Sequence, residues 1–192
     1  NNGFDDDGNG YVDDVFGFDA VGGTGDPWDD HGHGTHVAGT IGAAANNNYP
    51  HVGVAWKVRL MACKMATADG FTFTSDEVEA INYAVANGAK VINASWGGFA
   101  FSQALLDSIA AASTNGVLFV AAAGNSANDN DLVPTYPASF DVENIVSVAA
   151  TDRKDNILWW SNFGKQTVHV GAPGTEIFST WNGSDTDYAT IV

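Results

Sequence analysis

The sequence predicts an α/β fold, a three-layer sandwich in which helices cover a mainly parallel β-sheet. Two observations lead to this class. Segments of helical periodicity alternate with short, continuous apolar runs, and such runs are typical of parallel strands that are buried on both faces. The 192 residues, 45% of them hydrophobic, are also enough to bury one sizeable core. We therefore expect one domain over residues 1–192.

The elements of the first half follow from the spacing of apolar side chains. Residues 1–30 are rich in Gly, Asp and Asn without apolar periodicity, so we expect an ordered loop. Small and apolar residues recur at helical spacing over 35–45, which predicts a helix that begins near His33. The alternating segment 58–65 is expected to be a strand.

The second half repeats a helix and strand pattern. Helices are predicted from Ser75 to a stop at 87–88, and over 105–112 with a stop at 115–116. Apolar runs predict strands over 91–95, 117–122, 145–149 and 167–170. Because the chemistry of parallel sheets lies at the carboxyl ends of their strands, we expect functional residues there.

The charge balance excludes one class of partner and favours another. Asp and Glu number 23 against 7 Lys and Arg, a net charge of −16, so a nucleic-acid surface is not expected. Over 5–14, oxygen side chains alternate around a glycine, as in calcium loops. A solvated acidic turn is the alternative. The expected calcium ligands are Asp5, Asp7 and Asn9, with the Tyr11 carbonyl and Asp13 or Asp14.

The single cysteine and the apolar stretches do not show in which cellular compartment the protein resides. Cys63 excludes an internal disulfide and, within an apolar segment, is expected to be a core residue rather than a nucleophile. No apolar stretch approaches the roughly 18 residues that span a bilayer, and residue 1 is not followed by a charged and then apolar leader. We expect the natural N-terminus, with any secretion signal, to lie upstream.

The segment 30–40 carries three histidines and the clearest chemistry. A histidine between glycines at the mouth of a helix suits general base catalysis, because imidazole titrates near neutral pH. The spacing of His31, His33 and His36 equally fits a zinc site, although Thr35 stands where that motif has an aspartate. Spacing alone therefore leaves a catalytic base and a zinc-dependent hydrolase open.

A family resemblance favours the base. The run His-Gly-Thr-His-Val-Ala-Gly at 33–39 resembles the active-site histidine motif of the subtilisin-like serine proteases. Segments 91–98, 121–125, 136–138, 146–149 and 171–174 are similar to later motifs of that family, in the same order. The resemblance covers nearly the whole chain and implies a subtilisin-like fold that is incomplete at both ends, a partial peptidase domain.

The resemblance implies a role for each matched residue. His33 would be the catalytic base and Asn125 the oxyanion-hole amide. An extended substrate would lie between two segments of the chain. One wall of the specificity pocket would consist of small, uncharged residues, which predicts that the enzyme prefers apolar substrate side chains or accepts a broad range. These substrate residues are Ser95, Trp96, Gly97, Gly70 and Phe71, with Ala122, Ala123 and Gly124 as the wall.

The family's nucleophilic serine and orienting aspartate find no match within the chain; Asp29 and Asp30 do not align with the latter. The resemblance thus implies a secreted, extracellular serine endopeptidase that is inactive as this piece alone. It would be stabilised by calcium, with Asn47 in a second loop or, alternatively, in an ordinary turn. Polypeptide substrates and a propeptide are the expected partners of a monomer. A non-catalytic calcium-binding pseudoprotease module is the remaining alternative.

Overall fold

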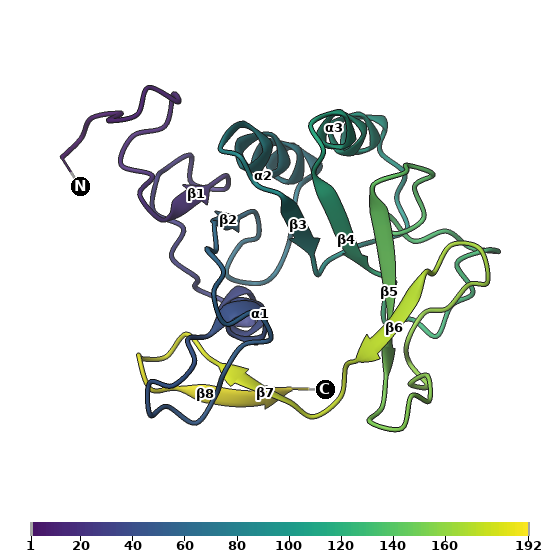
Figure 1. Ribbon diagram of the computed structural model, residues 1–192. Helices are drawn as coiled ribbons and strands as arrows, with labels where there is room; N and C mark the ends of the chain where they lie inside the picture. Colours follow the sequence, from purple (N-terminus) through teal and green to yellow (C-terminus); the bar gives the residue numbers. More distant parts are fainter. Residues whose placement is uncertain (1, 192) are drawn as a thin grey trace. The chain divides into compact units, whose positions relative to one another are not determined.

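The computed structural model describes residues 2–191, which form two compact units (Figure 1). The first unit comprises residues 2–87 and 176–191, and the second comprises residues 88–175. Within residues 2–191, no helix has both the length and the apolar character that crossing a bilayer requires.

The second unit contains a four-stranded parallel sheet in the order β3-β4-β5-β6. The strands are β3 (Val91–Ala94), β4 (Leu118–Ala122), β5 (Ile145–Thr151) and β6 (Val170–Pro173). Helix α3 (Gln103–Thr114) crosses from β3 to β4 and packs on β4. The α/β class with a parallel sheet is thereby confirmed.

Local sequence explains where α3 begins and how it packs. The Ser102 hydroxyl caps the helix by accepting a hydrogen bond from the Leu105 amide (3.3 Å), which satisfies one free N–H of the first turn. Leu105, Ile109 and Ala112 fall on one face and are buried. The face packs over β4, where Phe119 is buried completely. The predicted helix was therefore correct but shorter than the observed one.

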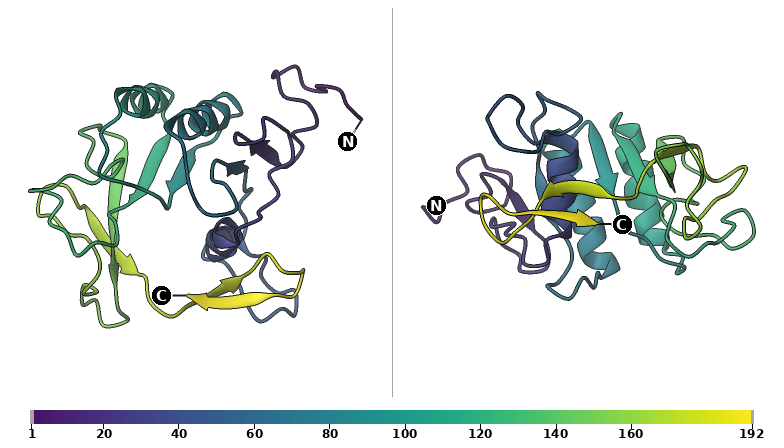
Figure 2. Two further views of the ribbon diagram at one scale, coloured as in Figure 1. Left: turned by 180° about the vertical axis from the view of Figure 1, so that it is seen from behind. Right: turned by 90° about the horizontal axis from the view of Figure 1, so that it is seen from below.

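The first unit combines helices with two small sheets. Helices α1 (His33–Gly42) and α2 (Thr74–Ala86) accompany a parallel pair, β1 (Gly17–Asp19) and β2 (Ala62–Lys64). An antiparallel hairpin is formed by β7 (Ile177–Thr180) and β8 (Tyr188–Ile191). Figure 2 shows α1 lying alongside this hairpin, and α1 contacts β7.

An aromatic cluster forms the core between β1 and α2. The rings of Tyr11 and Phe18 lie 4.3 Å apart, and Tyr83 lies 4.9 Å from Tyr11 and 5.2 Å from Phe18. Cys63 and Met61 pack against this cluster. Burial raises the pKa of the Cys63 thiol to about 11, so it behaves as the expected core residue and not as a thiolate nucleophile.

Several elements differ from the sequence prediction. The strand expected over 58–65 is limited to β2, because its partner β1 offers only three residues. Residues 2–30, expected to be loop throughout, include β1. The strand expected from 167 begins at Val170, since the Thr167 amide and hydroxyl both donate to the Asp131 carboxylate (3.0 and 2.7 Å). The hairpin of β7 and β8 was not predicted.

Candidate active site

His33 is the first residue of α1, and one carboxylate fixes the turn that presents it. Asp29 Oδ1 accepts hydrogen bonds from the amides of His31 (3.0 Å) and Gly32 (2.8 Å). Asp29 Oδ2 accepts from the amide and the hydroxyl of Thr35, both at 2.7 Å. Gly32 has a left-handed φ of 103°, which a side chain would strain. Asp29 therefore caps the helix and leaves the His33 side chain exposed.

The electrostatic surroundings keep His33 neutral near pH 7. Its pKa is lowered by partial desolvation and then by repulsion from His31, while the Asp29 carboxylate opposes both effects. Although desolvation raises the pKa of Asp29, hydrogen bonds from Gly32, Thr35 and His31 outweigh it and lower that pKa overall. Asp29 thus stays ionised, and a neutral imidazole at His33 can accept a proton.

The three histidines of this segment do not converge. The rings of His31 and His33 are 6.4 Å apart, with interplanar angle 77°. His36 is buried, and its Nε2 faces the carbonyl oxygens of Ile177 (3.1 Å) and Ala189 (3.2 Å). Across residues 2–191, no three His, Cys, Asp or Glu side chains are grouped to hold a metal ion. The zinc-site interpretation was wrong because His36 points into the packing between α1 and the hairpin.

The hairpin supports α1 along its length. The Ser179 hydroxyl donates to the His36 carbonyl (2.8 Å), and the Thr180 hydroxyl donates to the Thr35 carbonyl (2.9 Å). Gly39 permits this approach, since a Cβ there would lie 2.1 Å from Thr180 Oγ1 and 2.5 Å from Ser179 Oγ. The helix that carries His33 is therefore clamped at its N-terminus and along one face.

Gly70 and Phe71 lie in a turn beside the histidine pair. The Gly70 amide donates to the Thr67 carbonyl (2.8 Å), and the Thr67 amide donates to the Phe71 carbonyl (2.9 Å). A Cβ on Gly70 would lie 3.2 Å from His31 Nε2, so the turn packs against that ring. Phe71 is 70% exposed. The predicted substrate-flanking turn therefore lies beside His31, two residues before His33.

In the second unit, Ser95, Trp96 and Gly97 continue from the end of β3. The next residue, Gly98, exchanges two hydrogen bonds with Tyr136, of 2.8 and 2.7 Å. A Cβ on Gly97 would lie 2.8 Å from the Tyr136 carbonyl oxygen. The chain after β3 is therefore held extended, and only glycine fits at position 97.

The segment after β4 presents Asn125. Ala122 ends the strand, and Ala123 is buried with its amide donating to the Val148 carbonyl (2.9 Å). Gly124 adopts a φ of +117°, which turns the chain away from the sheet. Asn125 is exposed, and its side chain makes no hydrogen bond to residues 2–191. Its amide is therefore available to a ligand, as an oxyanion donor must be.

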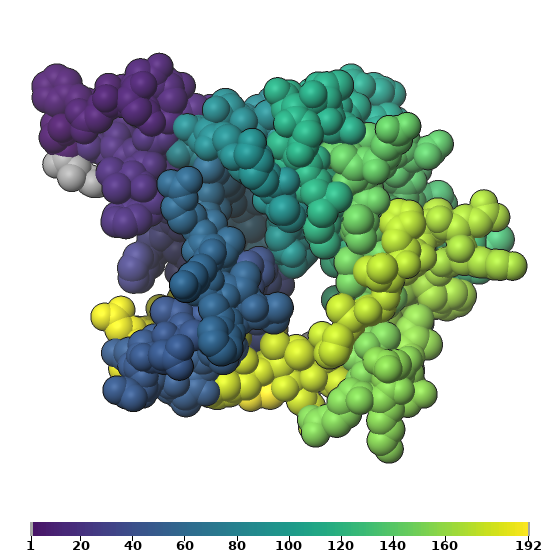
Figure 3. All heavy atoms as spheres, viewed as in Figure 1, coloured from purple at the N-terminus to yellow at the C-terminus, as the bar shows by residue number. Residues whose placement is uncertain are grey.

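The acidic loop lies at the surface of the first unit, as its purple atoms show in Figure 3. Asp5 accepts hydrogen bonds from the amides of Gly10 (2.8 Å), Gly8 (2.7 Å) and Asn9 (3.2 Å), which lower its pKa. Asp7 accepts from the Asn9 amide (3.2 Å). The carboxylates of Asp5 and Asp7 therefore turn toward the amides of their own loop.

The remaining predicted ligands also have protein partners. Asp13 accepts from the amides of Asn2 (2.7 Å) and Gly3 (2.9 Å), and Asp14 accepts from the Tyr83 hydroxyl (2.6 Å). The oxygen donors suit calcium chemically, and each carboxylate has lone pairs beyond those used. The structure does not gather three of the carboxylates, so the ligand set stays a prediction.

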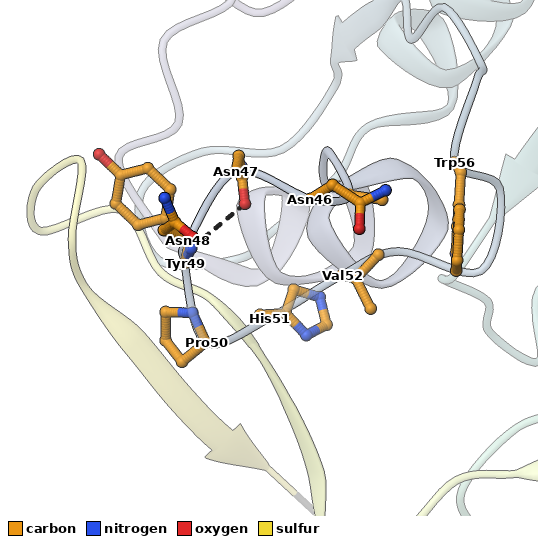
Figure 4. A pocket seen from close by; sticks show the side chains of 9 residues that line it. Asn46, Asn47, Asn48, Tyr49, Pro50, His51, Val52 and Trp56 are labelled. Carbon is orange, nitrogen blue, oxygen red and sulfur yellow. Dashed lines mark hydrogen bonds between the residues drawn. The ribbon is translucent and has the colours of Figure 1, made fainter.

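Asn47 lies in an exposed turn after α1, drawn in Figure 4. Its side-chain oxygen accepts a hydrogen bond from the Tyr49 amide (3.2 Å). The turn, residues 45–52, and Trp56 line a cavity of about 220 Å³. The oxygen of Asn47 closes a local turn here, and its role as a calcium ligand stays a prediction.

Comparison with known proteins identifies the family. The model of the subtilase family matches residues 1–191. The chain belongs to the subtilase family. Thermitase of Thermoactinomyces vulgaris is 37% identical over 87% of the chain and 58% of its own length. Minor extracellular protease Epr of Bacillus subtilis is 37% identical over 91% of the chain and 27% of its own length.

Other comparisons agree on the subtilase fold. Subtilisin-like protease 2 of Plasmodium falciparum is 38% identical over 80% of the chain and 12% of its own length. The crystal structure of a cold-adapted subtilisin-like serine proteinase superposes with a TM-score of 0.79 at 36% identity, covering 91% of the chain and 60% of that structure. The subtilase segment therefore spans less than two thirds of each of these relatives.

The sequence did not indicate the contacts that Asp29 and Asn162 make beside the candidate site residues of this subtilase. Asp29 was considered only as a triad carboxylate, whereas it caps α1. Its spacing of six residues from Thr35 differs from the three that mark a local capping box, so the pattern gave no signal. Asn162 contacts the segment around Asn125 but lies 34 residues from Asn128 and 36 residues from Ser126 in the chain, so sequence spacing does not reveal the contact.

Proposed function

We propose that the full-length protein is a secreted serine endopeptidase that cleaves peptide bonds through a Ser-His-Asp triad. His33 is its general base, and the serine and aspartate lie outside residues 1–192. One observation carries the proposal: an exposed histidine is fixed at the start of α1 within a chain of the subtilase family, and its surroundings lower its pKa. The piece of 192 residues alone is expected to be inactive.

The chemistry follows from these positions. His33 accepts the serine proton as the serine oxygen attacks the scissile carbonyl, and later donates a proton to the leaving amine. The attacked carbonyl oxygen becomes negatively charged. The exposed amide of Asn125 donates a hydrogen bond to this oxygen, which typically stabilises the transition state by about 3 kcal/mol.

The substrate is proposed to be an extended polypeptide. The backbone of Ser95, Trp96 and Gly97 adds to it as a neighbouring strand, and Gly70 and Phe71 of the first unit are proposed as further substrate-binding residues. Ala122, Ala123 and Gly124 form a pocket wall without charge, which favours an apolar or broad preference. A propeptide would bind through the same residues. The relative from Bacillus subtilis is named an extracellular protease, which supports secretion. The enzyme is proposed to be a monomer.

The proposal is tested by replacing the base. In the full-length protein, His33→Ala should lower kcat for a peptide substrate by several orders of magnitude, on the order of 10⁶ as in subtilisin. Lys154→Ala, a change in an exposed turn of the second unit, is the control and should leave kcat unchanged. A full-length protein without peptidase activity would refute the proposal and favour a pseudoprotease, whereas a His33→Ala variant that keeps the activity would refute the role of His33 as the base.

Calcium is proposed as a structural ion of the loop 5–14, held by Asp5, Asp7, Asn9, the Tyr11 carbonyl and Asp13 or Asp14. The proposal is supported by oxygen donors that suit calcium and by the strong self-repulsion of the sequence Asp5-Asp6-Asp7. Millimolar calcium should raise the Tm of the full-length protein, and the double variant Asp5→Asn, Asp7→Asn should reduce that gain. An equal gain in the variant would exclude this loop.

A further inference from the structure

One buried side chain holds the segment that carries Asn125. Asn162 is completely buried, and its backbone amide donates to the Gly124 carbonyl (2.8 Å). Its side-chain Nδ2 donates to the Ala123 carbonyl (3.0 Å). These two contacts fix the residues that immediately precede Asn125.

The other end of the same side chain fixes the residues that follow. Asn162 Oδ1 accepts hydrogen bonds from the amides of Ser126 (2.7 Å) and Asn128 (3.2 Å). A single asparagine therefore contacts the chain on both sides of Asn125, at positions −2, −1, +1 and +3. Asn125 itself stays exposed and receives none of these bonds.

Asn162 is held firmly in turn. Its Nδ2 lies 3.0 Å from Asn130 Oδ1 and 3.1 Å from Thr135 Oγ1. Asn130 is also buried, and its own Nδ2 donates to the Ala123 carbonyl (2.9 Å). A Cβ on Gly124 would lie 2.4 Å from Asn162 Nδ2, so glycine is required for the close contact. A buried network of this kind is rigid when its members are satisfied.

We propose that Asn162 is a positioning residue that orients Asn125 toward the oxyanion. The inference rests on the proposed peptidase function. An oxyanion donor is effective only if it is already aimed at the developing charge, and a displacement of about 1 Å can reduce the rate by about 10². Asn162 supplies that aim because it fixes the backbone before and after Asn125 without contacting the substrate.

A double-mutant cycle on the full-length protein tests this role. Asn125→Ala is expected to lower kcat for a peptide substrate by about 10²–10³. Asn162→Ala in the wild-type background is expected to lower kcat by about 10–100-fold. In the Asn125→Ala background the same change should cost less than about 3-fold, because the group that it positions has been removed.

Asn144→Ala is the matched control. This amide binds the Val117 carbonyl (2.9 Å) at the opposite end of β4, so its loss lowers stability without displacing Asn125. It should change kcat by the same small factor in both backgrounds. If the Asn162→Ala variant unfolds below the assay temperature, the double-mutant cycle is repeated with Asn162→Ser. The serine hydroxyl can still accept a hydrogen bond from one backbone amide.

The outcomes separate the inference from the proposed function. An equal loss of kcat for the Asn162 variant in both backgrounds would overturn the positioning role and leave the oxyanion role of Asn125 intact. If Asn125→Ala itself keeps the wild-type kcat, the proposed oxyanion role fails first, and the positioning role fails with it.

Discussion

Removal of the Asp29 charge is the sharpest test of how α1 is held. Asp29→Asn keeps the shape of the side chain and replaces one carboxylate oxygen by an NH₂ group. The two bonds to Oδ1, from His31 and Gly32, can persist. The two bonds to Oδ2, both from Thr35, cannot, because an NH₂ group does not accept them.

The expected loss follows from these bonds. Hydrogen bonds to charged groups contribute about 1.5–3 kcal/mol, and removal of a helix cap costs about 0.5–2 kcal/mol. Asp29 is half-buried, so solvent screening reduces the upper values. We expect Asp29→Asn to lower the free energy of unfolding by about 1 kcal/mol and Asp29→Ala by about 2 kcal/mol.

Urea unfolding of the full-length protein at several pH values measures this loss. The folded-state pKa of Asp29 is lowered, so its stabilisation is fully present above its unfolded pKa of about 3.9 and is lost as pH falls through the folded pKa. Wild type and Asp29→Asn should therefore differ at pH 7 and converge at strongly acidic pH.

The neighbouring carboxylate provides the control. Asp30 is exposed and pairs with Lys64, and exposed ion pairs contribute only about 0–1 kcal/mol. Asp30→Asn changes the net charge equally and should cost less than Asp29→Asn. Equal losses for the two variants, or a loss for Asp29→Asn that does not depend on pH, would refute the capping role.

Two further outcomes test the packing of the first unit. Gly39→Ala should lower the free energy of unfolding by about 1–3 kcal/mol, because the new methyl group overlaps Thr180 Oγ1; unchanged urea unfolding would contradict this contact. Cys63 should react with a thiol reagent at pH 8 about 100-fold more slowly in the folded protein than in urea, because burial raises its pKa to about 11. Equal rates would place the thiol at the surface.

Most of the second unit could be predicted because its elements are strongly patterned. The helix that contains Leu105, Ile109 and Ala112 has the 3.6-residue apolar period of an amphipathic helix. The apolar run of β4 is short and follows Asn115-Gly116, which favours a buried strand. The start of β6 could not be predicted, because Thr167 is bound to Asp131, 36 residues earlier in the chain.

The first unit was harder because its small sheets depend on distant partners. β2 has three residues only because β1 has three, and sequence spacing does not reveal that pairing. For the hairpin, a signal existed: Asn182 and Gly183 form an Asn-Gly turn signal between two runs that contain β-branched residues. The position of His33 at a helix start was predicted. The contacts of α1 with Asp29 and with the hairpin could not be predicted, because they depend on tertiary structure.

The contacts between α1 and the hairpin also bear on biosynthesis. His36 and the Ala189 carbonyl that faces its ring are 153 residues apart in the chain. At about 5–20 residues per second, a ribosome needs roughly 8–30 s to make the intervening polypeptide. During that interval a nascent α1 has none of its hairpin contacts. The helix that carries His33 can therefore gain its full set of hairpin contacts only after residue 189 has been synthesised.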